Sequence, residues 1–332
     1  MKLSSGIVTL SLALWAGSFV GQQPDPAALQ QYHQLVEATK LDRDGARPFH
    51  LKIESQLFDL KGKPSESGAI EEWWLAPDQF RIEINSGDIH EVILTGEPDQ
   101  VMPGVHRSEF LLRQLLSSAV SPLSPLNSAE AVSEVKRDIG GHILSCFALA
   151  IAVKGDLGRD TNYCREPGGD NVRLIVSPQS VSVRNRVGVF AGTNVALDLS
   201  ISYLGRPAVS GKVVLLQVFD PTASGSPILH VSKTYNTDPH IPIAAVVAGH
   251  RLSTPPIAYP LYARREQISG VVLLACRITR EGKIGAMDVV ASSNVLFNEA
   301  GMDGVRQWLF TPFKFKGQPA STQVLVRIYF NP

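Results

Sequence analysis

The alternation of apolar and polar side chains constrains this chain more than any other feature of its sequence. Over residues 49–57, apolar side chains at Phe49, Leu51, Ile53 and Leu57 are interleaved with polar ones. Successive side chains of a strand point to opposite faces, so this pattern predicts a half-buried strand. The alternation returns at residues 80–84, and the sequence therefore predicts an antiparallel meander.

Further short β-type runs and two helices complete the region before residue 250. Asp25 followed by Pro26 matches a helix N-cap and first helical position, so residues 26–40 are predicted to form an amphipathic helix. Ser108 is expected to cap a second, shorter helix. The remaining β-type runs are residues 174–176, 181–183, 195–201 and 212–219. We therefore expect an α+β chain whose N-terminal part is one long curved antiparallel sheet, resembling a half-barrel, with helices.

The length of 332 residues predicts two domains, at roughly 150 residues each. The formal net charge is +0, but residues 251–332 hold ten Lys/Arg against five Asp/Glu. No run of basic residues or basic stripe with interleaved aromatics concentrates this charge, so nucleic acid is not an expected partner.

The N-terminus has the pattern of an export signal. Lys2 is followed by the almost wholly apolar stretch 6–20 and then by polar, turn-forming residues from Gln22. Residues 1–21 are therefore expected to be either a cleaved signal peptide or a short membrane anchor, and the sequence leaves both open.

Three cysteines fit an exported protein. Cys146 and Cys164 are a disulfide candidate, although the sequence does not decide whether they pair. Cys276 lies in a dense apolar run and is expected to be a buried small hydrophobe.

No catalytic constellation is present in the sequence. The eight His are scattered, and neither metal-ligand spacings nor a phosphate loop nor a nucleophile elbow occurs. We expect His50 and the Glu71-Glu72 pair to be solvated strand residues. The sequence thus predicts a binding protein rather than an enzyme, with no cofactor and no metal site.

Residues 68–81 contain Gly68-Ala69-Ile70, then Trp73-Trp74-Leu75-Ala76-Pro77-Asp78-Gln79-Phe80-Arg81. This passage resembles LolA-like lipoprotein carrier domains, over about residues 26–235. The resemblance implies an open half-barrel lidded by helices, with an apolar hollow that receives acyl chains. The sequence does not separate such a cavity from a filled core.

The C-terminal segment predicts a β-β-α-β module. A strand over residues 268–279 and another over 284–290 form a hairpin around Gly282. Asn298 is expected to cap the helix that follows, and residues 323–330 alternate as a closing strand.

This order closely resembles the C-terminal domain of TonB-type energy transducers, over residues 251–332. The matching positions are Tyr259-Pro260, Ala263-Arg264, Gly270, Val272, Gly282-Lys283-Ile284, Ser292-Ser293, Leu296 to Ala300, Val305, Trp308, Phe310, Pro312, Gly317 and Pro319. The resemblance implies docking of an extended segment of an outer-membrane receptor by strand addition. Its site residues would be Tyr259 and Pro260, with Val324, Val326 and Ile328 of the final strand.

Two departures from the family pattern bear on this expectation. Gly301 and Gly304 stand where the family usually has Ala, which predicts a soft helix. Family transducers also carry a His in a membrane-spanning N-terminal helix, and residues 1–22 contain none. Coupling to the inner-membrane proton-driven motor complex is therefore left open.

These observations predict three parts: residues 1–21, a β-rich domain over 22–250, and a TonB-like domain over 251–332. The preferred function is that of a periplasmic or inner-membrane-anchored protein that docks an outer-membrane TonB-dependent receptor or similar envelope protein. The alternative is a soluble periplasmic carrier that binds a lipid, lipoprotein or other apolar ligand in the N-terminal half-barrel.

Overall fold

The structure is a computed structural model that describes residues 25–77, 79–94, 105–123, 130–151, 161–222, 251–315 and 318–332. The predicted signal or anchor over residues 1–21 lies outside the described residues, as do Asp78 and Gly317 of the two resemblances. Within the part that is described, no helix is both long enough and apolar enough to cross a bilayer.

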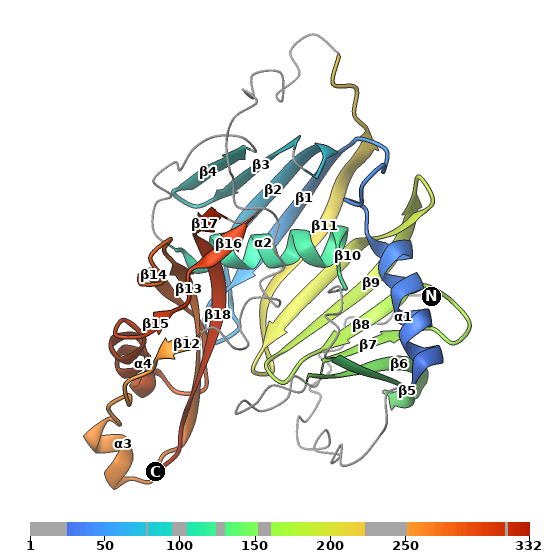
Figure 1. The fold of residues 1–332 in the computed structure, drawn as a ribbon. Coiled ribbons are helices and arrows are strands. Elements are labelled where there is room, and N and C mark those ends of the chain that lie inside the picture. The colour runs from blue at the N-terminus through green and yellow to red at the C-terminus, as the bar shows by residue number, and fades with distance from the viewer. Residues whose placement is uncertain are drawn as a thin grey trace. The chain divides into compact units, whose positions relative to one another are not determined.

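Eleven strands form one large antiparallel sheet in the order β4-β3-β2-β1-β11-β10-β9-β8-β7-β6-β5 (Figure 1). The sheet consists of two meanders, β1–β4 and β5–β11, which meet where β1 lies next to β11. The strands are β1 (Phe49–Phe58), β2 (Pro64–Ala76), β3 (Gln79–Ser86), β4 (Ile89–Leu94), β5 (Glu130–Ile139), β6 (His142–Ile151), β7 (Thr161–Arg165), β8 (Val172–Val176), β9 (Ser180–Phe190), β10 (Thr193–Tyr203) and β11 (Arg206–Val218). The predicted sheet with two helices is confirmed, whereas β5, β6 and β7 were not predicted from the sequence.

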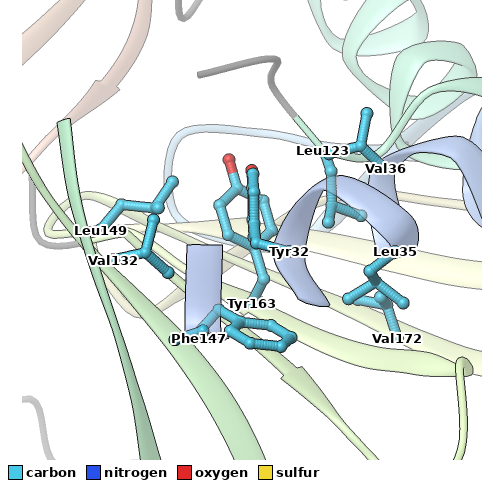
Figure 2. Packing of buried hydrophobic residues seen from close by; sticks show 10 residues of the cluster. Tyr32, Leu35, Val36, Leu123, Val132, Phe147, Leu149, Tyr163 and Val172 are labelled. Carbon is cyan, nitrogen blue, oxygen red and sulfur yellow. The ribbon is translucent and has the colours of Figure 1, made fainter. Parts of the chain in front are cut away.

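Helix α1 (Pro26–Thr39) begins as its sequence predicts. The Asp25 side chain accepts a hydrogen bond of 2.9 Å from the Ala27 N–H, and Pro26 is the first helical residue. Its buried face packs on an aromatic cluster, in which the Tyr32 ring centroid lies 5.8 Å from that of Phe147 and 5.6 Å from that of Tyr163 (Figure 2). Large side chains therefore fill the layer under α1.

The expected cap at Ser108 is wrong, because helix α2 (Arg107–Val120) already contains Ser108 in its first turn. The Arg107 N–H, one of the donors that a helix start leaves unpaired, donates instead to Asp288 Oδ2 at 2.7 Å. Further along α2, Leu115 lies against β11, where a Cβ added at Gly211 would be 2.4 Å from Leu115 Cδ2. The glycine thus allows α2 to approach the sheet closely.

The C-terminal segment contains a second, three-stranded sheet in the order β14-β13-β18. It is formed by β13 (Gly270–Ile278), β14 (Ile284–Ser292) and β18 (Thr322–Phe330), accompanied by α3 (Leu261–Arg265), the 3-10 turn η3 (Val295–Phe297) and α4 (Asn298–Val305). Short strand pairs complete it: β12 (Arg251–Ser253) with β15 (Leu309–Phe310), and β16 (Phe313–Phe315) with β17 (Gln318–Ala320). The predicted order of strand, strand, helix and strand is confirmed.

The expected cap at Asn298 is wrong. Asn298 is the first residue of α4, and the chain already turns in η3 before it. Asn294 caps that turn, because its side chain accepts a hydrogen bond of 3.0 Å from the Leu296 N–H. The turn therefore moves the capping role back to Asn294.

The chain divides into two compact units. The first comprises the described residues of Met1–Arg47, Leu51–Ser67 and Gln114–Leu216, and the second those of Pro48–His50, Gly68–Arg113 and Gln217–Pro332. The boundary at residue 250 stays a prediction.

Candidate partner-binding edge

Strand β18 forms one edge of the C-terminal sheet. It pairs along its nine residues with β13, in a register that runs from Thr322↔Ile278 to Phe330↔Gly270. In an antiparallel pair only every second residue of an edge strand directs its N–H and C=O toward its neighbour. The outward backbone groups of such an edge can pair with an incoming extended segment.

The side chains of β18 alternate between the two faces of the sheet. Val324, Val326 and Ile328, the residues predicted from the sequence to bind a partner, are 1%, 3% and 5% exposed. They are thus core residues of this sheet, and a partner added at the edge would meet their backbone rather than their side chains.

The opposite face of β18 carries the accessible side chains. Tyr329 is 47% exposed, and the guanidinium carbon of Arg327 lies 5.0 Å from the centroid of its ring. Leu325 is half-buried on the same face. These three residues were not predicted from the sequence, although the same alternation that marks the core positions also identifies them.

Tyr259 packs at the end of the same strand. Its ring centroid lies 5.8 Å from that of Phe330, the last residue of β18, and 5.8 Å from that of Phe297. Its hydroxyl donates to the Ile268 carbonyl oxygen at 2.5 Å. Pro260 follows at the N-cap position of α3, so the structure brings the Tyr-Pro pair to one end of β18.

A glycine in β13 makes room for this aromatic cluster. The Phe297 and Phe330 rings stack with centroids 4.5 Å apart. A Cβ added at Gly270, the register partner of Phe330, would lie 2.3 Å from Phe297 Cε2. Gly270 is therefore required for close ring packing rather than for a turn.

Four exposed apolar residues flank the cluster. Leu261 and Tyr262 follow Tyr259-Pro260 directly and are 71% and 62% exposed, while Val295 and Leu296 precede Phe297. Because the Tyr259 and Phe297 rings are in contact, both pairs lie near one end of β18. Exposed apolar groups that lie close together are typical of a protein-binding surface.

Cationic side chains lie in the same region. Arg264 and Arg265 occupy the last turn of α3, and the Arg264 guanidinium carbon lies 5.7 Å from the Tyr259 ring centroid. With Arg327 of β18 they make three positive charges, against the single negative charge of Glu266 that follows α3.

Cys146 and Cys164 face each other as register partners of β6 and β7. Their sulfur atoms are 2.09 Å apart, as in a disulfide, and both side chains are fully buried. Cys276 in β13 is also buried and free, and burial raises the pKa of its thiol.

The structure corrects two expectations about polar residues of β1 and β2. His50 is half-buried, stacks on Trp73 at 4.6 Å between ring centroids, and lies 2.6 Å from Glu71 Oε1. Glu72 is 0% exposed because it shares a face with the buried Ile70 and Trp74. Neither residue is a solvated strand residue.

A group of three or more His, Cys, Asp or Glu side chains that could hold a metal ion is absent from the described ranges. The charged cluster of Glu91, Glu109 and Arg113 is a local ion-pair network, with nitrogen–oxygen distances of 3.2 Å and 2.8 Å. Burial raises the pKa of Glu91, and the positive charge of Arg113 opposes that shift.

Comparison with known proteins agrees with the C-terminal resemblance. Residues 255–332 match the family model described as the C-terminal of the Gram-negative bacterial TonB protein. Among solved structures, the TonB C-terminal domain of Pseudomonas aeruginosa is 25% identical, with a TM-score of 0.23, over 25% of this chain and 84% of its own.

Two further solved structures are similar to the N-terminal part. One is a putative outer membrane lipoprotein-sorting protein domain from Vibrio parahaemolyticus, 7% identical with a TM-score of 0.34, covering 60% of this chain and 93% of its own. The other is a LolA superfamily protein from Nitrosomonas europaea, 6% identical with a TM-score of 0.35, covering 57% of this chain and 94% of its own. No curated protein matches the chain.

Proposed function

We propose that residues 251–332 dock an extended segment of an envelope protein, such as an outer-membrane receptor, by adding it as a strand along β18. The observation that supports this proposal most is the position of β18, which lies at an edge of its sheet over nine residues. The family match over residues 255–332 supports the same function. The site of action would be the periplasm, where such a receptor presents its inner side.

Main-chain hydrogen bonds would supply affinity that does not depend on the partner's sequence. Tyr329 and Leu325 then offer apolar contacts, and Arg327 offers a charge-assisted contact to a carboxylate of the partner. We infer an extended partner segment that contains at least one acidic residue. Val324, Val326 and Ile328 would position the edge from inside the sheet.

Tyr259 and Pro260 would act at the end of the edge. The Tyr259 hydroxyl holds the Ile268 carbonyl oxygen, while its ring packs on Phe330. This arrangement fixes the chain beside the last residue of β18, where the exposed Leu261 and Tyr262 can cover the end of an added strand.

Site-specific photo-crosslinking in a Gram-negative host tests the proposal and identifies the partner. A photoreactive residue is placed in the full-length protein at Leu325 or Tyr329, and at Ala286 of the opposite edge strand β14 as a matched control. Docking at β18 predicts the same cross-linked envelope protein from Leu325 and Tyr329, and a much weaker product from Ala286. Equal yields from both edges would count against it.

A further inference from the structure

Two nearly buried glutamates lie against one arginine in the second compact unit. Glu91 of β4 and Glu109 of α2 are 8% and 2% exposed. Arg113 follows Glu109 by one turn of the same helix, and its guanidinium nitrogens lie 3.2 Å from Glu91 Oε1 and 2.8 Å from Glu109 Oε1. A buried carboxylate is costly unless it has a partner, because it loses its contact with water. Two carboxyl groups therefore share one guanidinium.

This arginine does not satisfy both carboxyl groups. Among the described residues, neither Arg113 Nε nor Glu109 Oε1 has a hydrogen-bond partner, although the two atoms are close. A side-chain hydrogen bond joins Glu91 to Glu109 instead. Such a bond between two carboxyl groups requires a proton on one of them, because an ionised carboxylate can only accept. The pair is thus arranged to hold one proton.

The charges that act on Glu91 come from α2 and β13. Burial raises the pKa of Glu91, the positive charge of Arg113 opposes that shift, and Glu109 adds to it. Arg277 of β13 lowers the pKa more weakly, and the register partner of Glu91 on β3 is the uncharged Ile84. Because burial has the largest effect, Glu91 keeps its proton above the usual range of a glutamate.

The start of the same helix holds strand β14. Arg107, two residues before Glu109, donates from its backbone N–H to Asp288 Oδ2 at 2.7 Å and from Nε to the Val290 carbonyl oxygen at 2.8 Å. The register between β13 and β14 skips Val290, so β14 is bulged there and this oxygen is available to Arg107. The C-terminal sheet is thus attached to α2 beside the glutamate pair.

We propose that the proton shared by Glu91 and Glu109 makes the attachment of β14 to α2 sensitive to pH. When both groups are ionised, two buried negative charges lie against one guanidinium and repel each other. Relief of this repulsion requires Glu109, and with it the start of α2, to move away from β4. That movement would separate Arg107 from Asp288 and Val290.

The direction of the pH effect follows from the raised pKa of Glu91. A group that binds its proton more tightly in the closed structure stabilises that structure at low pH, and this contribution is lost as the pH rises through the raised pKa. The attachment should therefore be strongest below pH 4.5, the usual pKa of a glutamate, and weaken above it. This property goes beyond docking at β18, since it concerns how firmly the docking sheet is held.

Amide hydrogen exchange of the full-length protein at several pH values tests the proposal. The variants are Glu91→Gln and Glu109→Gln, in which an amide replaces one carboxyl group and can still donate a hydrogen bond. Glu83→Gln is the matched control, because Glu83 lies on the neighbouring strand β3 and forms its own ion pair with Arg81. Peptides that cover β14 contain none of these positions, so the intrinsic exchange rate cancels when wild type and variant are compared at one pH.

The ratio of the exchange rates in β14, wild type over variant, carries the expected effect. For Glu91→Gln and for Glu109→Gln this ratio should be smallest at pH 5 and rise at least about threefold by pH 8, because only the wild type can lose the shared proton. For Glu83→Gln the ratio should stay near one at every pH.

Three results would overturn the proposal. A ratio that does not change with pH in Glu91→Gln would show that no shared proton controls the attachment. Faster exchange in both Gln variants than in the wild type at every pH would show that the ionised pair stabilises the contact. An equal rise with Glu83→Gln would show that the effect is not specific to the pair. Docking at β18 is tested independently by cross-linking.

Discussion

The two glycines of α4 should respond differently to the same substitution by Ala. At Gly304 an added Cβ would lie 2.5 Å from Ile257 Cγ1, 2.8 Å from Cγ2 and 3.0 Å from Cβ. Because all three atoms belong to the branched base of Ile257, a change of rotamer cannot relieve every contact. At Gly301 the nearest atom is Ile328 Cδ1, the end of a flexible side chain, at 3.3 Å.

The sizes of the two effects follow from these distances. Overpacking costs about 1–3 kcal/mol, whereas replacing Gly by Ala in a helix interior contributes up to about 1 kcal/mol. Gly304→Ala should therefore lower the local stability by about 1 kcal/mol, which is roughly a fivefold rise in opening. Gly301→Ala should leave it unchanged or raise it by up to about 1 kcal/mol.

Amide hydrogen exchange of the full-length protein measures this difference in local stability within the C-terminal sheet. Peptides that cover β13 and β18 report the local opening of the C-terminal sheet without assuming that the whole chain unfolds in one step. Faster exchange is expected in Gly304→Ala and not in Gly301→Ala. If Gly304→Ala protects these strands as well as Gly301→Ala does, the contact with Ile257 is not a close-packed one and the reasoning fails.

Three further predictions concern single groups. Gly282→Ala should prevent folding of the C-terminal sheet, because Gly282 has φ +80° and a Cβ there would overlap the Phe310 carbonyl oxygen. Amide hydrogen exchange in β13 of this variant that is as slow as in the wild type would contradict the prediction. Reduction of the Cys146–Cys164 disulfide, whose cysteines are 18 residues apart, should lower the free energy of unfolding by about 3 kcal/mol. Urea titrations with and without reductant measure this difference, and an unchanged unfolding midpoint would contradict the prediction. Cys276 should stay unlabelled by iodoacetamide at pH 8 until the protein unfolds, because burial raises its thiol pKa, and rapid labelling of the folded protein would show that it is accessible.

The sequence predicted several strands from their local pattern of side chains. Alternation identified β1 and β18, and Asp25 with Pro26 identified the start of α1. It could also have identified β5 and β6, since the glycines at 140 and 141, both with positive φ, form the turn between them.

What the sequence could not provide depends on contacts between distant segments. Gly304 was expected to soften α4, yet it lies against Ile257 and is required for close packing. The side chain of Asp288, and not that of Ser108, accepts a hydrogen bond from a backbone N–H at the start of α2. The pairing of Glu91 with Glu109 gives no local sign in the sequence, because it depends on how α2 packs against β4.

The candidate edge was predicted in its position but not in its chemistry. The sequence marked Val324, Val326 and Ile328 because they are the apolar members of the alternation, and the structure places them in the core. The side chains that a partner can touch are the intervening ones, among them Arg327 and Tyr329. Apolar residues on a strand are more informative about the core than about a partner.

The central claim is that a partner segment adds a strand to β18, and residue-resolved amide hydrogen exchange tests it most directly. The segment identified by cross-linking is synthesised as a peptide and added to the full-length protein, and exchange is compared along β13, β14 and β18. Strand addition predicts slower exchange at alternate amides of β18 only, because the intervening amides already pair with β13. Protection confined to β14, or uniform protection without alternation along β18, would contradict the account.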